Sequence, residues 1–220
     1  MKKTLAILAA ALLAAAGLRG QECSTTWPYL YPEFRAGTIY MNGGTKIVQT
    51  LNVHLLRSRM HFIDAGLVKE LVTSDVVAVE IGADRFIAVG QDIMQVVASN
   101  SEGFVSALRL GEFDKLQETG GAYGSSSTTA ATTKLTSVEV SGRVNQSHME
   151  LWNNRRSGAE VGIRTTYYIT AGGRTYRAKR SEIEETLSPE RKAEFKAFLK
   201  STKIKWNSPE SLLELTDFLK

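Results

Sequence analysis

The run IRTTYYITAGGRTYRA, residues 163–178, decides the fold class of this chain. Its first half alternates apolar or aromatic side chains with polar ones, which is the two-residue period of a strand with one buried face. Gly172 and Gly173 then accept a positive φ, so the chain can reverse directly into a second strand. The run therefore predicts a β-hairpin near the C-terminus.

Similar strand signals recur upstream of this hairpin. Across residues 37–110, short apolar runs are separated by turn residues, and none shows sustained helical periodicity. The turn residues at 42–44 and 82–84 predict two further hairpins. In LNVHL at 51–55, polar side chains alternate with apolar ones, so we expect the polar set to point outward.

Beyond the hairpin, the apolar period changes to that of a helix. Residues 188–190 and 208–210 both read Ser-Pro-Glu, which combines a capping serine, a proline at the first helical position and an early negative charge. The stripes that we expect to be buried contain Phe195, Phe198, Leu199 and Thr202 in the first helix, and Leu212, Leu215 and Leu219 in the second.

These patterns predict an α+β fold. It has an antiparallel β-rich body, formed as a meander, a curved sheet or a small sandwich, with a C-terminal hairpin and two short helices. We expect a signal peptide at 1–20, a β-rich region at 21–118 and a flexible Gly/Ser/Thr segment at 119–133. Residues 134–220 hold the C-terminal hairpin and the two helices, which we expect to pack on the same body.

The N-terminus predicts export. Residues 1–20 read MKKTLAILAAALLAAAGLRG, a basic start followed by an uncharged run that is too short to span a bilayer as a helix. Cleavage after Ala16 and cleavage after Gly20 both stay open. Cys23 raises the alternative of a lipoprotein, and only then would the protein meet a membrane. The charged Glu22 before it disfavours that reading.

The composition narrows the function classes. The 220 residues include 27 Lys+Arg against 23 Asp+Glu, a net charge of +4, and removal of three basic residues with the leader leaves +1. A nearly neutral protein is not expected to steer nucleic acid toward itself. The single cysteine permits no intramolecular disulfide and no zinc site that needs several thiolates.

Catalytic signals are sparse. The chain has three histidines, and the nearest acid–imidazole pair is His61 with Asp64, which point to opposite strand faces unless the chain turns between them. His54 and His61 are seven residues apart across a break, so they too can meet only if the chain turns between them. Nucleotide, metal and nucleophile motifs do not occur, so we expect no cofactor, no metal and no catalytic residue. A hydrolase using His61, Asp64 or Glu80 is kept as the alternative.

A possible binding surface consists of aromatic and basic residues. Flat rings near the mature N-terminus suit sugar stacking, although packing in the core or at a sheet edge is the favoured reading. Basic side chains on the hairpin and a lysine row on the first helix suit an anionic partner, against the simpler reading of solvated faces. The candidate residues are Trp27, Tyr29, Arg174, Tyr176, Arg177, Lys192, Lys196 and Lys200.

The leader, YYI and GGRTY within 167–176, SPE and FKAFLK within 188–200, SPESLL at 208–213 and AYG at 122–124 carry a resemblance. Together they resemble a family of secreted, functionally uncharacterised envelope proteins of Bacteroidota-type bacteria. The resemblance implies a place outside the cytoplasm and assigns no catalytic residue. We therefore expect an exported, non-catalytic envelope protein that binds or scaffolds an envelope protein or an anionic polysaccharide. The alternatives are a secreted hydrolase of envelope polymers and a polyanion or nucleic-acid-binding module.

Overall fold

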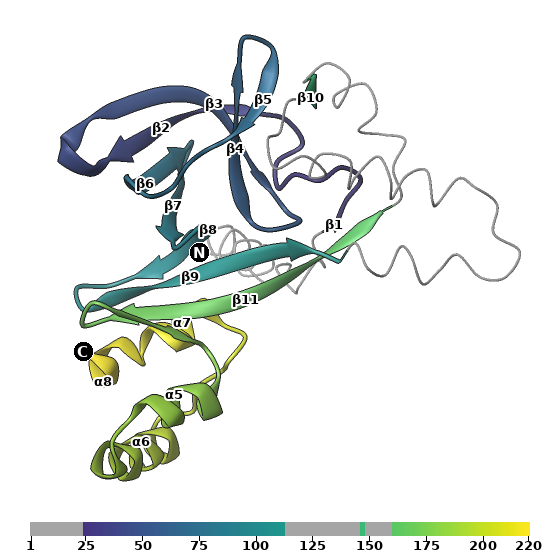
Figure 1. Ribbon diagram of the computed structural model, residues 1–220. Coiled ribbons are helices and arrows are strands. Elements are labelled where there is room, and N and C mark those ends of the chain that lie inside the picture. The colour runs from purple at the N-terminus through teal and green to yellow at the C-terminus, as the bar shows by residue number, and fades with distance from the viewer. Residues whose placement is uncertain (1–23, 113–145, 148–159) are drawn as a thin grey trace, which may run out of the picture.

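The computed structural model describes residues 24–112, 146–147 and 160–220. Within these ranges the strands come first and the α-helices follow at the C-terminal end, which confirms the predicted α+β class (Figure 1). The expected signal peptide, Cys23 and the flexible segment expected at 119–133 lie outside the described residues, and so does one of the three histidines, His148.

The strands of the described ranges form one curled antiparallel sheet (Figure 1). Its order is β1-β11-β9-β8-β7-β6-β2-β3-β4-β5-β10, and β12 pairs with β11 off this path. The strands are β1 (Ser24–Thr25), β2 (Arg35–Met41), β3 (Lys46–His54), β4 (Arg59–Asp64), β5 (Leu67–Glu70), β6 (Val76–Ile81), β7 (Asp84–Val89), β8 (Asp92–Ser99), β9 (Gly103–Gly111), β10 (Gln146–Ser147), β11 (Val161–Ala171) and β12 (Arg174–Arg177).

The hairpins expected from sequence are present. Gly172 and Gly173 both have positive φ, at 54° and 73°, and turn β11 into β12. The short 3-10 turn η2 (Asn42–Gly44) joins β2 to β3. On its other side β11 pairs with β9 along its length, so the C-terminal hairpin belongs to the same sheet as the upstream strands. The fold is therefore a curved antiparallel sheet.

Strand β5 was not expected. It follows a tight turn at Ala65 and Gly66, whose φ values of 49° and 78° are both left-handed. Alanine seldom adopts a positive φ, so the pair Ala-Gly gives a weaker turn signal than Asn-Gly or Gly-Gly. The turn places Leu67 opposite Asp64 and extends the sheet by one strand.

In the described part of the chain the C-terminal region forms four α-helices, rather than the predicted two, on the β9–β11 side of the sheet and away from β2–β5 (Figure 1). Both Ser-Pro-Glu starts are confirmed, because Ser188 and Ser208 cap α6 and α7 with their side chains. The extra helices are short segments before and after them. The bounds are α5 (Arg180–Thr186), α6 (Pro189–Ser201), α7 (Pro209–Leu213) and α8 (Thr216–Leu219).

The two largest of four apolar clusters among the described residues hold these parts together. One lies inside the curled sheet and includes Ile39, Leu51 and Phe86. The second joins β9 and β11 to the helices, where Phe195 and Ile169 are fully buried. None of the helices in the described ranges has the length and apolar character needed to cross a membrane.

Candidate functional site

The aromatic segment at residues 27–34 packs over one face of β3. Tyr29 forms an isolated antiparallel bridge with His54, and the Trp27 indole N–H donates to the Tyr31 carbonyl at 3.0 Å. Trp27 is 4% exposed and Tyr29 is 0% exposed, so neither belongs to a binding surface. This corrects the sugar-stacking candidate and agrees with the favoured reading of core packing.

Because this segment covers β3, the expected alternation at 51–55 is wrong: all five side chains are buried. Asn52 forms the hydrogen bonds that the backbone of the covering segment would otherwise make to water. Its Oδ1 accepts from the Tyr31 N–H at 3.0 Å, and its Nδ2 donates to the carbonyls of Tyr31 and Glu33 at 3.0 and 3.1 Å. A buried polar residue on β3 is thus fully hydrogen-bonded.

The same face brings His54 and His61 together, contrary to the expectation from sequence. In the β3–β4 hairpin His54 lies opposite Arg59, which makes His61 its diagonal neighbour on the same face. The imidazole rings stack with centroids 4.7 Å apart and planes 9° apart, and each residue is 1% exposed. The two histidines meet, although they are seven residues apart, because the hairpin places β3 and β4 side by side.

The environment of His54 favours a neutral ring. Burial, followed by the neighbouring His61, holds the pKa of His54 well below its usual value. The Tyr29 hydroxyl lies 3.0 Å from His61 Nδ1, and burial raises the pKa of Tyr29. His61 Nε2 faces the Glu70 carboxylate across β5 at 3.7 Å, and this imidazole holds the pKa of Glu70 below its usual value.

The predicted hydrolase residues do not assemble around this pair. Asp64 forms an ion pair with Lys69, and Glu80 accepts a hydrogen bond from the Tyr40 hydroxyl at 2.6 Å. Among the residues that the structure describes, no three His, Cys, Asp or Glu side chains are grouped to hold a metal ion. The acid beside His61 is Glu70, which sequence reasoning missed because β5 was missed.

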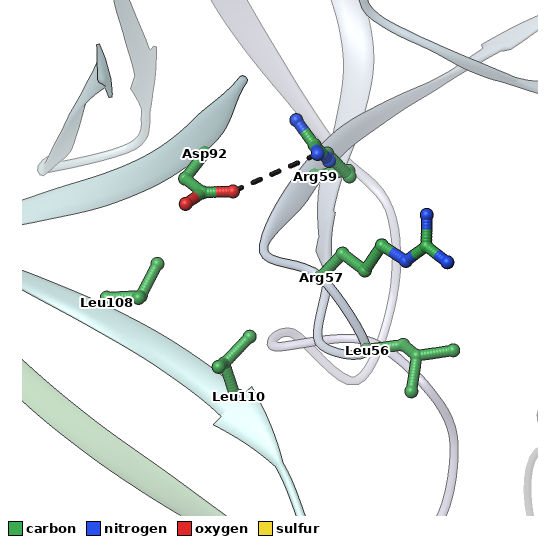
Figure 2. A pocket seen from close by; sticks show the side chains of 6 residues that line it. All are labelled: Leu56, Arg57, Arg59, Asp92, Leu108 and Leu110. Atoms are coloured by element: carbon green, nitrogen blue, oxygen red, sulfur yellow. Dashed lines mark ion pairs between the residues drawn. The ribbon is translucent and has the colours of Figure 1, made fainter. Parts of the chain in front are cut away.

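A pocket opens close to the histidine pair, at the turn between β3 and β4. It has a volume of about 230 Å³, and Figure 2 shows Arg59 reaching toward Asp92 at the start of β8, with an N–O distance of 4.0 Å. Arg57 lies on the same turn. The apolar part of the lining comes from Leu56 and, on β9, Leu108 and Leu110.

Ser58 fixes the turn that carries both arginines. Its φ of 51° is left-handed, and its hydroxyl donates to the Ile93 carbonyl at 2.6 Å. The Ile93 N–H donates back to the Ser58 carbonyl at 2.8 Å. These two bonds hold the turn against β8, so the Arg59 side of the pocket is positioned before any ligand arrives.

The predicted basic residues lie elsewhere and are partly neutralised. Arg177 on β12 and the adjacent Lys179 both pair with Glu182 of α5, at 3.1 and 3.3 Å. Arg180, with smaller contributions from Lys192 and Lys196, holds the pKa of Glu184 below its usual value. Arg174 and Lys200 are exposed, and Tyr176 is half-buried against the helices.

Sequence reasoning missed the pocket residues. In the sequence, Arg57 and Arg59 only mark a break between two strand patterns, and Asp92 and Leu108 are distant from them along the chain. The curled sheet brings β8 and β9 to the β3–β4 turn, and no local pattern records that approach. The one usable signal was two arginines flanking Ser58 at a turn, where charged side chains can face a ligand.

Fold and site together define an α+β protein with a curled antiparallel sheet, a closed histidine pair and an open arginine-bearing pocket. Comparison with family models, curated proteins and solved structures gives no match. The resemblance to secreted envelope proteins therefore stays a prediction.

Proposed function

We propose that this protein is an exported, non-catalytic binding module of the cell envelope, and that the Arg59 pocket holds an acidic group of its ligand. The basic start and short apolar run of residues 1–20 support export. The pocket supports binding, because it joins guanidinium groups to an apolar lining in a pre-positioned turn. Such concave, mostly apolar sites with a few polar groups are typical of small-ligand binding.

The pocket is the observation that carries the proposal. Its lining carries two guanidinium groups, on Arg57 and Arg59, and one carboxylate, on Asp92, and three leucines offer an apolar surface beside them. Arg59 and Asp92 are 4.0 Å apart, a loose pair that a carboxylate could enter by forming a bidentate bond to the guanidinium. A carboxylate on a sugar or short aliphatic framework matches this lining.

The hydrolase alternative fits the structure less well. A general base must reach the proton that it removes from a substrate or a water. His54 and His61 are buried beneath Tyr29, and the pocket lining includes neither of them. The histidine pair is better explained as interior packing that needs no ligand.

Calorimetric titration with tetragalacturonate and with octanoate tests the pocket. We expect at least one probe to bind, with Arg59→Gln weakening that binding by about tenfold. Arg59→Lys should lose less, since it keeps the charge but not the bidentate fork. Lys196→Gln removes one exposed cation of the α6 lysine row and should bind like the wild type. Failure of both probes, or unchanged binding by Arg59→Gln, would refute the pocket as the ligand site.

Intact mass and cell fractionation test export independently of the pocket. The full chain expressed in a bacterial host should appear outside the cytoplasm with a mass that starts after Ala16 or after Gly20. A form starting at Cys23 with added acyl mass would make the protein a lipoprotein. Residues 1–20 retained in the cytoplasm would refute export.

A further inference from the structure

Residues 27–29 lie over the histidine pair, and we call them the aromatic cover. The Tyr29 ring contacts both imidazoles at steep angles, with its centroid 5.2 Å from that of His54 and 5.6 Å from that of His61. Tyr29 itself is fully buried, and Trp27 is nearly so. The aromatic cover therefore encloses the two imidazoles and separates them from solvent.

The aromatic cover is held at both ends. Before it, the two residues of β1 pair with β11, and after it the Tyr31 backbone is held by Asn52. Two backbone hydrogen bonds join the stretch between these points to β3 and its turn. The Leu30 N–H donates to a β3 carbonyl at 2.9 Å, and the Leu55 N–H donates to the Pro28 carbonyl at 2.8 Å. A short segment held in this way can open locally while the sheet stays folded.

The closed cover leaves His54 no place for a second proton. Among the described residues, Nε2 of His54 and Nε2 of His61 are buried and have no hydrogen-bond partner. An N–H at His54 Nε2 would be a buried donor without an acceptor, and its charge would lie beside the stacked ring of His61. Burying an unpaired charge is costly, so the closed form excludes this proton.

The charged groups around the pair do not supply the missing acceptor. On β5, Glu70 faces Nε2 of His61 at 3.7 Å, so its carboxylate can compensate a proton on His61. Arg59 and Arg57 lie close enough to add to the effect of His61 in lowering the pKa of this carboxylate. The cover contributes the neutral Tyr29 hydroxyl, which lies at 3.0 Å from Nδ1 of His61. A proton on His54 therefore gains no acceptor from the described groups.

We propose that the aromatic cover is an acid-operated latch, in which protonation of His54 moves Trp27 and Tyr29 away from β3. The open form admits water, which accepts a hydrogen bond from the charged imidazole. Opening also turns two buried rings toward solvent, so the protein presents an aromatic surface in acid that it hides at neutral pH. This inference does not rest on the proposed ligand site.

Amide hydrogen exchange followed by NMR on the full chain tests the latch. The Leu30 and Leu55 N–H groups bond across the cover, so their exchange reports its opening. An exposed histidine has a pKa of about 6.5, so the opening constant should rise about thirtyfold between about pH 7.5 and pH 5. This factor applies after correction for the intrinsic exchange rate at each pH.

The same measurement separates local opening from unfolding of the whole chain. At each pH the opening constant of the two amides should exceed the global unfolding constant obtained from urea titration. Equal constants would show that the cover opens only when the entire fold does. That result would overturn the proposal.

Two variants separate protonation from packing. His54→Phe keeps a ring under the cover and should abolish the thirtyfold rise. Tyr29→Phe keeps the ring of the cover but loses the hydroxyl beside His61, so it should open more at both pH values by the same factor and keep the rise. A wild type whose two amides do not open further in acid, or a His54→Phe variant that keeps the rise, would refute the latch.

Discussion

Acid should destabilise this protein through His54. Burial holds the pKa of this imidazole well below its usual value in the folded chain, whereas in the unfolded chain its pKa is about 6.5. Below that pH the unfolded state binds a proton that the folded state does not. The free energy of unfolding therefore falls as the pH drops below about 6.5, and it continues to fall down to the folded pKa.

The slope has a definite size. One proton taken up only by the unfolded chain changes the free energy of unfolding by about 1.4 kcal/mol per pH unit. Replacement of His54 by phenylalanine keeps a ring beside His61 and removes the titrating group. The two curves should therefore diverge by up to that slope as the solution is acidified, with the wild type losing more stability.

Urea unfolding at a series of pH values between about 7.5 and 5 measures this difference. The other titrating groups are common to both proteins and cancel to first order. Between pH 6 and 5 we expect the His54→Phe slope to be lower by close to one proton. Equal slopes in the two proteins would refute the reasoning that His54 stays neutral in the fold.

Three further changes test the packing. Phe195→Ala empties the centre of the helix cluster and should cost about 3–5 kcal/mol in urea unfolding, more than Phe198→Ala at a half-buried position. Gly103→Ala directs a methyl group into the Thr170 carbonyl of β11, and a loss of about 1–3 kcal/mol is expected; an unchanged denaturation midpoint would contradict this contact. Asn52→Ala leaves the Tyr31 backbone groups buried without their partners and should cost about 3 kcal/mol or more, whereas a neutral result would show that water replaces the amide.

Local patterns predicted much of the fold. The glycine turn at 172–173, the Asn-Gly-Gly turn at 42–44 and the two Ser-Pro-Glu helix starts each carry their own conformational preference, and all appear where expected. The turn at Ala65 was missed because its left-handed φ is set by the surrounding strands and not by the residue. Helix α8 was merged with α7 because Leu212, Leu215 and Leu219 keep one apolar stripe across the break.

The histidine pair and the pocket could not be predicted because they depend on contacts between β3 and segments distant in sequence. The alternation at 51–55 indicates one exposed face, and that inference fails only because the aromatic segment covers the face and Asn52 bonds to its backbone. The same covering encloses His61 and His54, of which the alternation had predicted only His54 to face solvent. Pocket residues such as Asp92 join the β3–β4 turn through the curl of the sheet.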